Sequence, residues 1–162
     1  RPEPLTVGDV ITKAQRIIVV EAVDNPSNIG AIVRCATGLG WDGLICDSTS
    51  ADPLSRRALR VSMGSAFSLR FARTNDIAQT LSELRAQNFK LFALTPDEKA
   101  TNISDVKLES SQKRALIFGS ERAGLSTQAI ANADALVRIE MNPEVDSLNV
   151  AAAAAISCYA LR

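Results

Sequence analysis

Apolar and polar positions along the chain form alternating blocks that predict strands and helices in turn. Six short apolar blocks are typical of strands; the first, residues 16–23, is β-branched and nearly continuous, as in a strand buried on both faces, whereas residues 66–71 alternate between apolar and polar. They occupy residues 16–23, 43–46, 66–71, 90–94, 115–118 and 135–139. The expected helices are residues 29–39, 53–61, 127–132 and 148–161, with one more carrying the apolar stripe Ile77, Leu81 and Leu84. This order predicts an α/β fold with a mainly parallel six-stranded sheet flanked by helices.

Several helix ends can be predicted from local residue types. Gly40 follows the first helical stretch and suits a left-handed residue that ends it. Asn75 and Ser126 stand where N-caps are expected. Either Asp146 or Ser147 is expected to cap the last helix.

The first 15 residues differ from the alternating blocks that follow. They are polar and contain Pro2 and Pro4. We expect residues 1–15 to be a linker or an extended lead-in outside the core. The total of 162 residues suffices for one core, so residues 16–162 are expected to form one domain.

Charge and residue usage exclude several kinds of site. The chain has 18 basic and 18 acidic residues, so any nucleic-acid site must be a local patch. It has no histidine, which excludes a Ser-His-Asp triad and metal sites that need imidazole. The cysteines Cys35, Cys46 and Cys158 form no CxxC pair, and no apolar run reaches the roughly 18 residues of a membrane span. We expect a cytoplasmic protein without a metal or a membrane partner.

Three segments that follow expected strands combine polar residues with glycine, at residues 25–34, 118–126 and 139–150. Ligands of parallel α/β sheets bind beyond the carboxyl ends of the strands. Gly119 and Gly124 let backbone groups approach a flat ligand, although a plain turn capped by Ser126 has the same pattern. Arg34 can bind a phosphate, although an ordinary surface arginine would look alike. The Asn149 side chain is free to project sideways from the last helix, where its amide can hydrogen-bond to a ligand.

Together these segments resemble the three motifs of the SpoU (TrmH-like) branch of the SPOUT RNA methyltransferases. The motifs are NIGAIVR at residues 28–34, FGSERAGL at 118–125, and IEM at 139–141 followed by VDSLNVAA at 145–152. RVSMGSAF at 60–67 is similar to the family's segment before the third strand. The resemblance implies a homodimer with a deep C-terminal trefoil knot. It also implies transfer of a methyl group from S-adenosylmethionine to a ribose 2′-hydroxyl of structured RNA, with rRNA favoured over tRNA.

The resemblance also assigns roles by position. Arg34 would orient the ribose hydroxyl and stabilise its developing charge, since a guanidinium stays protonated. The same catalytic site would contain Asn28, Glu121, Ser147 and Asn149. The residues that would enclose S-adenosylmethionine, and S-adenosylhomocysteine as product, are Leu94, Thr95, Gly119, Ser120, Gly124, Ile139, Met141 and Leu148.

Some features depart from the family pattern or extend it. Glu140 replaces a proline of many relatives, and residues 142–144 replace glycines. Arg56, Arg57 and Arg60, together with Arg34, are expected to bind RNA, although such a cluster is also typical of a solvated helix face. Residues 1–15 resemble the linker that follows an N-terminal RNA-binding domain in many members, so we expect such a domain in the full enzyme.

Two other functions stay open from the sequence. One is a non-catalytic RNA-binding or ribosome-assembly factor that retains the fold; the five polar site residues argue against it. The other is a nicotinamide-dependent oxidoreductase on a doubly wound sheet, which the missing GxGxxG motif argues against. Dependence of methyl transfer on Arg34 separates the first alternative from the enzyme, and binding of NAD would identify the second.

Overall fold

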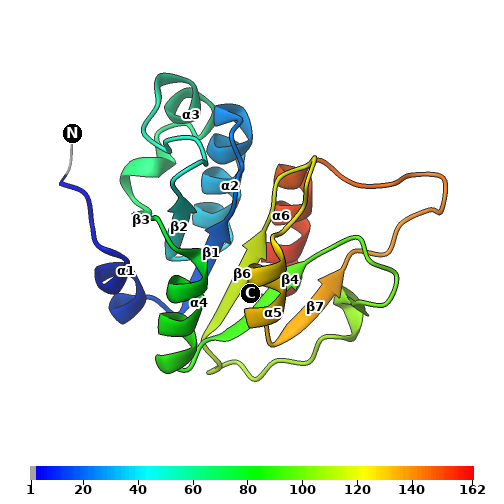
Figure 1. Cartoon of the computed structure of the whole chain (residues 1–162). Coiled ribbons are helices and arrows are strands. Elements are labelled where there is room, and N and C mark those ends of the chain that lie inside the picture. Colours follow the sequence, from blue (N-terminus) through cyan, green and yellow to red (C-terminus); the bar gives the residue numbers. More distant parts are fainter. Residues whose placement is uncertain (1–2) are drawn as a thin grey trace.

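A single parallel sheet organises the computed structural model, which describes residues 3–162 (Figure 1). Seven strands pair in the order β3-β2-β1-β6-β4-β7-β5 within this part of the chain. They are β1 (Arg16–Val20), β2 (Gly43–Asp47), β3 (Arg70–Thr74), β4 (Lys90–Leu94), β5 (Thr101–Asn102), β6 (Arg114–Phe118) and β7 (Ala135–Arg138). The predicted α/β class and parallel pairing are therefore confirmed.

The number of strands and the start of the third one correct the sequence prediction. The sheet has a seventh strand, β5, which pairs with β7 through only two polar residues and so leaves no apolar signal. The expected strand at 66–71 begins instead at Arg70. Residues Ser65–Phe67 form a 3₁₀ helix, η1, because Gly64 has a φ of +80° and the buried Ala66 holds the turn against the core.

Helices cover both faces of the sheet. They are α1 (Val7–Lys13), α2 (Pro26–Gly38), α3 (Arg56–Val61), α4 (Ile77–Ala86), α5 (Thr127–Asn132) and α6 (Val150–Ala160), with a second 3₁₀ turn, η2 (Ile103–Asp105). Ile18 and Val20 of β1 belong to the core shared with α2 and α6, whereas Ile17 and Val19 belong to the core shared with α1, α4 and α5. This alternation explains why the strand is an unbroken apolar run.

The expected lead-in contains a helix that packs on the core. Helix α1 begins with a capping box, in which the Asp9 backbone N–H donates to Thr6 Oγ1 (3.1 Å) and the Thr6 N–H donates to Asp9 Oδ2 (2.9 Å). Val10 and Ile11 are buried against the sheet. The expectation of an extended segment outside the core is therefore wrong for these residues. Pro2 lies outside the described residues.

The helix ends follow the sequence prediction in part. Gly40 has a φ of +77° just beyond α2, and the Ser126 side chain accepts from the Ala129 N–H at the start of α5, as expected. Asp76, not Asn75, caps α4. Asn149, not Asp146 or Ser147, caps α6 by accepting from two backbone N–H groups. This correction bears directly on the site.

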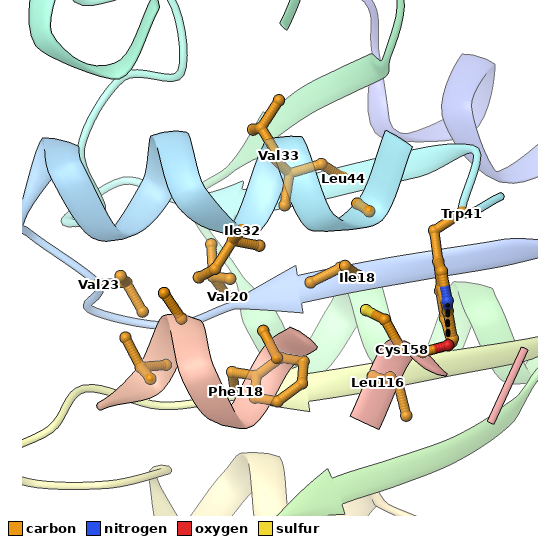
Figure 2. Close-up of a cluster of buried hydrophobic side chains, with 14 of the residues drawn as sticks. Ile18, Val20, Val23, Ile32, Val33, Trp41, Leu44, Leu116, Phe118 and Cys158 are labelled. Atoms are coloured by element: carbon orange, nitrogen blue, oxygen red, sulfur yellow. Dashed lines mark hydrogen bonds between the residues drawn. The ribbon is translucent and has the colours of Figure 1, made fainter. Parts of the chain in front are cut away.

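Helices α2 and α6 pack on each other beside the centre of the sheet. Both helices contribute to one hydrophobic cluster that includes Ile32, Phe118 and Cys158, and the Trp41 indole N–H donates to the Cys158 carbonyl at 3.0 Å (Figure 2). Burial raises the pKa of the Cys46 and Cys158 thiols to about 12. This packing fixes the amino-terminal ends of both helices at the same edge of the sheet.

The described residues contain neither a helix that could span a membrane nor a cluster of metal-ligating side chains. No helix within residues 3–162 combines the length and the apolar character needed to cross a membrane. In the same residues, cysteine and carboxylate side chains form no group of three or more that could hold a metal ion.

Candidate functional site

A cavity of about 480 Å³ lies beyond the carboxyl ends of β4, β6 and β7. Its walls come from the ends of these strands, from the segment after β6 and from the long segment between β7 and α6, drawn in orange in Figure 1. All eight residues expected to enclose the cofactor line it: Leu94, Thr95, Gly119, Ser120, Gly124, Ile139, Met141 and Leu148. The volume is in the range of small-molecule sites.

The segment after β6 folds back tightly on itself. The Gly124 N–H donates to the Ser120 carbonyl at 2.9 Å, and the Ala123 N–H donates to Ser120 Oγ at 3.1 Å. Gly124 has a φ of +66°, which favours glycine. A Cβ on Gly119 would lie 2.3 Å from the Gly124 carbonyl carbon, so only glycine fits there. This fold leaves backbone atoms of the segment exposed to the cavity.

Three polar side chains meet at the rim of the cavity. Asn149 Nδ2 donates to Glu121 Oε1 at 2.6 Å and to Asn28 Oδ1 at 3.1 Å. Asn149 Oδ1 accepts from the Ala151 and Ala152 N–H groups at the start of α6. The Asn149 amide is therefore fixed in orientation, and it joins the three segments that carry the motifs. We call Asn28, Glu121 and Asn149 the polar cluster.

The amino-terminal end of α6 also holds the carboxylate of this cluster. Glu121 Oε1 accepts from the Val150 N–H at 3.1 Å. Helix N-termini favour negative charge because their first N–H groups lack partners within the helix. Glu121 Oε2 has no partner among the described residues, so it remains able to accept a hydrogen bond from a ligand.

Arg34 and Ser147 are not hydrogen-bonded to the polar cluster. Ser147 lines the cavity and is exposed. Arg34 is exposed on α2, about two turns beyond Asn28, and makes no hydrogen bond or ion pair among the described residues. Four of the five expected catalytic residues thus lie at the cavity or in the cluster, and Arg34 stands apart from both.

The other expected RNA-binding arginines lie on α3, which packs along α2. A Cβ on Gly30 of α2 would lie 2.6 Å from the Ala58 carbonyl of α3, so the two backbones are in close contact. Arg57 Nε donates to Ser27 Oγ at the start of α2, whereas Arg56 and Arg60 are exposed. The arginine-bearing helix is therefore anchored beside Asn28.

The positions that depart from the family pattern form an ordered turn. Asn102 Nδ2 donates to Glu140 Oε2 at 2.8 Å, which ties the segment to β5. Asn142 accepts from the Glu144 N–H through its side chain and from the Val145 N–H through its carbonyl, both at 3.0 Å. Ile139 and Met141 still line the cavity, so these substitutions leave it open.

One residue that supports the site was not predicted from the sequence. Glu21 follows β1, and its Oε2 accepts from the Ser126 N–H at 2.8 Å. The Glu21 N–H donates to the Phe118 carbonyl at 2.9 Å. Glu21 therefore joins the end of β1 to both ends of the segment that lines the cavity. The available signal was a lone acidic residue within the apolar block 16–23; the structure ends this strand at Val20.

Glu21→Ala is expected to loosen this segment. It leaves the Ser126 N–H without its carboxylate acceptor, and hydrogen bonds to charged groups contribute about 1.5–3 kcal/mol. We expect a lower free energy of unfolding and faster amide hydrogen exchange over residues 119–126. Glu21→Gln retains an acceptor oxygen and is the control, with exchange close to wild type. Equal exchange in the alanine variant and the wild type would show that the contact does not hold the segment.

Known proteins resemble the chain over nearly its whole length. The model of the SpoU rRNA Methylase family matches residues 15–159. An uncharacterized tRNA/rRNA methyltransferase of Mycobacterium tuberculosis is 41% identical over 98% of this chain and 55% of its own length. The 23S rRNA (guanosine(2553)-2′-O)-methyltransferase RlmP of Bacillus subtilis is 30% identical over 94% of this chain and 60% of its own. The chain thus spans somewhat more than half of these relatives.

Solved structures give the same result for the fold. The AdoMet-bound rRNA methyltransferase of Sinorhizobium meliloti superposes with a TM-score of 0.90 at 27% identity, over 99% of this chain and 60% of that one. The SpoU methyltransferase AviRb of Streptomyces viridochromogenes, also with AdoMet, gives 0.84 at 28% identity, over 98% and 64%. The family match, the sequence relatives and the fold agree, and the chain belongs to the SpoU rRNA Methylase family.

Proposed function

We propose that the chain transfers a methyl group from S-adenosylmethionine to a ribose 2′-hydroxyl of structured RNA, with rRNA favoured over tRNA. The observation that carries this proposal is the polar cluster at the rim of the cavity, built from all three motif segments. RlmP, whose name gives an rRNA 2′-O-methyltransferase, is the relative that supports the ribose hydroxyl as acceptor.

The cavity fits S-adenosylmethionine in size and in the character of its walls. Leu94, Ile139 and Leu148 offer apolar contact for a flat ring, and the tight fold at Gly119 exposes backbone groups for hydrogen bonds. When bound, the cofactor supplies an electrophilic methyl group on a positively charged sulfur. Two of the structural relatives hold AdoMet.

The chain's own residues would then bind and orient the RNA. Arg34 would orient the ribose hydroxyl and stabilise the negative charge that develops on its oxygen. A guanidinium has donors and no acceptor, so Arg34 has no role as a base. The polar cluster would hold the nucleotide beside the cavity, and Ser147 would contact it from the cavity wall.

We further propose that the chain acts as a homodimer with the C-terminal segment in a trefoil knot. Helix α6 supports the dimer, because Ile156 and Tyr159 leave apolar side chains exposed on an otherwise alanine-rich helix. A second copy of the chain would cover this face. The Val150 N–H at the start of α6 donates to Glu121 in the segment after β6. This contact between the last helix and the earlier segment supports the knot.

Calorimetric titration of S-adenosylmethionine and S-adenosylhomocysteine into the chain tests the proposal, with NAD as the control. We expect saturable binding of both, near one per subunit, and no binding of NAD. Absence of binding to the folded chain would contradict the cofactor assignment and favour a non-catalytic RNA-binding factor. Binding of NAD alone would favour an oxidoreductase.

A further inference from the structure

An exposed apolar pair lies next to the arginines of α3. Met63 and Phe67 are 74% and 66% exposed, although both belong to an ordered segment that packs on the core. Arg56 and Arg60 precede them on α3 and are also exposed. We call Arg56, Arg60, Met63 and Phe67 the α3–η1 surface.

The backbone holds these two apolar side chains outward. Met63 has a φ of +54°, a conformation that L side chains rarely adopt, and Gly64 follows at +80°. The Met63 N–H donates to the Arg60 carbonyl (3.2 Å), and the Phe67 N–H donates to the Gly64 carbonyl (3.1 Å). Ala66 and Leu69 on either side of Phe67 are buried. The phenyl ring is therefore presented to solvent by a fixed turn.

The charge around this pair is strongly positive. Residues 53–75 contain five arginines and no acidic residue, within a chain whose basic and acidic residues balance. Arg73 donates to carbonyls of the β2–α3 connection, and Arg57 donates to Ser27. Arg56, Arg60 and Arg70 make no hydrogen bond or ion pair among the described residues, so their guanidinium groups are available to an anionic partner.

We propose that the α3–η1 surface binds an unpaired stretch of the substrate RNA, with a base stacked on Phe67 and phosphates at Arg56 and Arg60. The proposal rests on the proposed function for its choice of RNA. Exposed aromatic rings bind unpaired bases by stacking, and arginines bind the phosphates beside them. Arg57, the neighbour of Arg56 on α3, donates to Ser27, which precedes Asn28 of the polar cluster, so the Arg56 end of this surface lies toward that cluster.

Variants at Phe67 test the stacking, with a 20-nucleotide single-stranded RNA and a hairpin of the same composition as probes. Stacking of one base predicts a roughly 5- to 100-fold weaker affinity for the single strand in Phe67→Ala. Phe67→Leu, which is apolar without a ring, is expected to lose as much. Phe67→Trp is expected to retain affinity, and the fluorescence of its exposed indole should be quenched by the single strand. Unchanged affinity in Phe67→Ala, or no binding of either probe to the wild type, overturns the proposal.

Two further measurements separate this inference from others. Titration of S-adenosylmethionine should give wild-type affinity in every Phe67 variant. Cofactor binding without Phe67-dependent RNA binding overturns the inference and leaves the proposed function standing, whereas the reverse result overturns the proposed function alone. The mass in solution should be the same for wild type and Phe67→Ala. A dimer that dissociates in Phe67→Ala would show that a second copy covers this surface, which also overturns the inference.

Discussion

Under the proposed function, replacing Arg34 by alanine is expected to lower methyl transfer to an unmodified rRNA transcript by roughly 100- to 1,000-fold, the usual effect of removing one group that stabilises developing charge. The expected affinity for S-adenosylmethionine stays within about twofold of wild type, because Arg34 does not line the cavity. The free energy of unfolding should also change little, since the side chain is exposed and makes no hydrogen bond or ion pair among the described residues. Transfer of tritiated methyl groups, calorimetry and thermal unfolding measure the three quantities.

Arg34→Lys is the matched variant for this experiment. It retains the positive charge but loses the planar fork that holds an oxygen by two parallel hydrogen bonds. We expect a rate between those of the alanine variant and the wild type. A rate for Arg34→Ala within about threefold of wild type would contradict the catalytic assignment. Arg34 would then be an ordinary surface arginine.

The strands of the sheet could be predicted well because burial on both faces leaves a continuous apolar run. Residues 90–94 and 115–118 match β4 and β6 within one residue. Prediction failed where the signal was local rather than periodic. The capping box of α1 occupies only Thr6 and Asp9, and β5 has two polar residues. At residues 66–71, alternation of apolar and polar residues imitated a strand, although a left-handed Gly64 imposed a 3₁₀ turn.

The location of the cavity could be predicted for a topological reason, whereas its eight expected lining residues came from the family resemblance. The carboxyl ends of parallel strands meet at one edge, so segments that follow β4, β6 and β7 converge there whatever their separation in sequence. The contacts within the polar cluster could not be predicted in the same way. Asp146, Ser147 and Asn149 are all residue types that cap helices well. In the folded chain, Glu121 accepts hydrogen bonds from the Asn149 amide and from the Val150 N–H, and these contacts hold Asn149 at the N-cap position.

Gly119→Ala is expected to abolish tight cofactor binding, with at least a 10- to 100-fold loss of affinity for S-adenosylmethionine in calorimetry, because a small displacement of a binding loop has effects of this order. The added Cβ would lie 2.3 Å from the Gly124 carbonyl carbon and 2.5 Å from the Gly124 oxygen and the Leu125 nitrogen. All three are backbone atoms, so the segment itself must move. The free energy of unfolding should fall by about 1–3 kcal/mol, as in other overpacked positions.

Two other glycines separate this clash from the general effect of adding a methyl group. A Cβ on Gly38 in α2 meets nothing within 4 Å, so Gly38→Ala should leave binding unchanged and raise stability by about 0.5–1 kcal/mol through helix propensity. A Cβ on Gly124 also meets nothing within 4 Å, but its φ of +66° disfavours alanine by about 1 kcal/mol. If Gly119→Ala weakens binding no more than Gly124→Ala does, backbone conformation rather than close contact shapes this wall. Wild-type affinity in Gly119→Ala would show that S-adenosylmethionine binds outside the cavity, because no ligand that relies on this wall could tolerate its displacement.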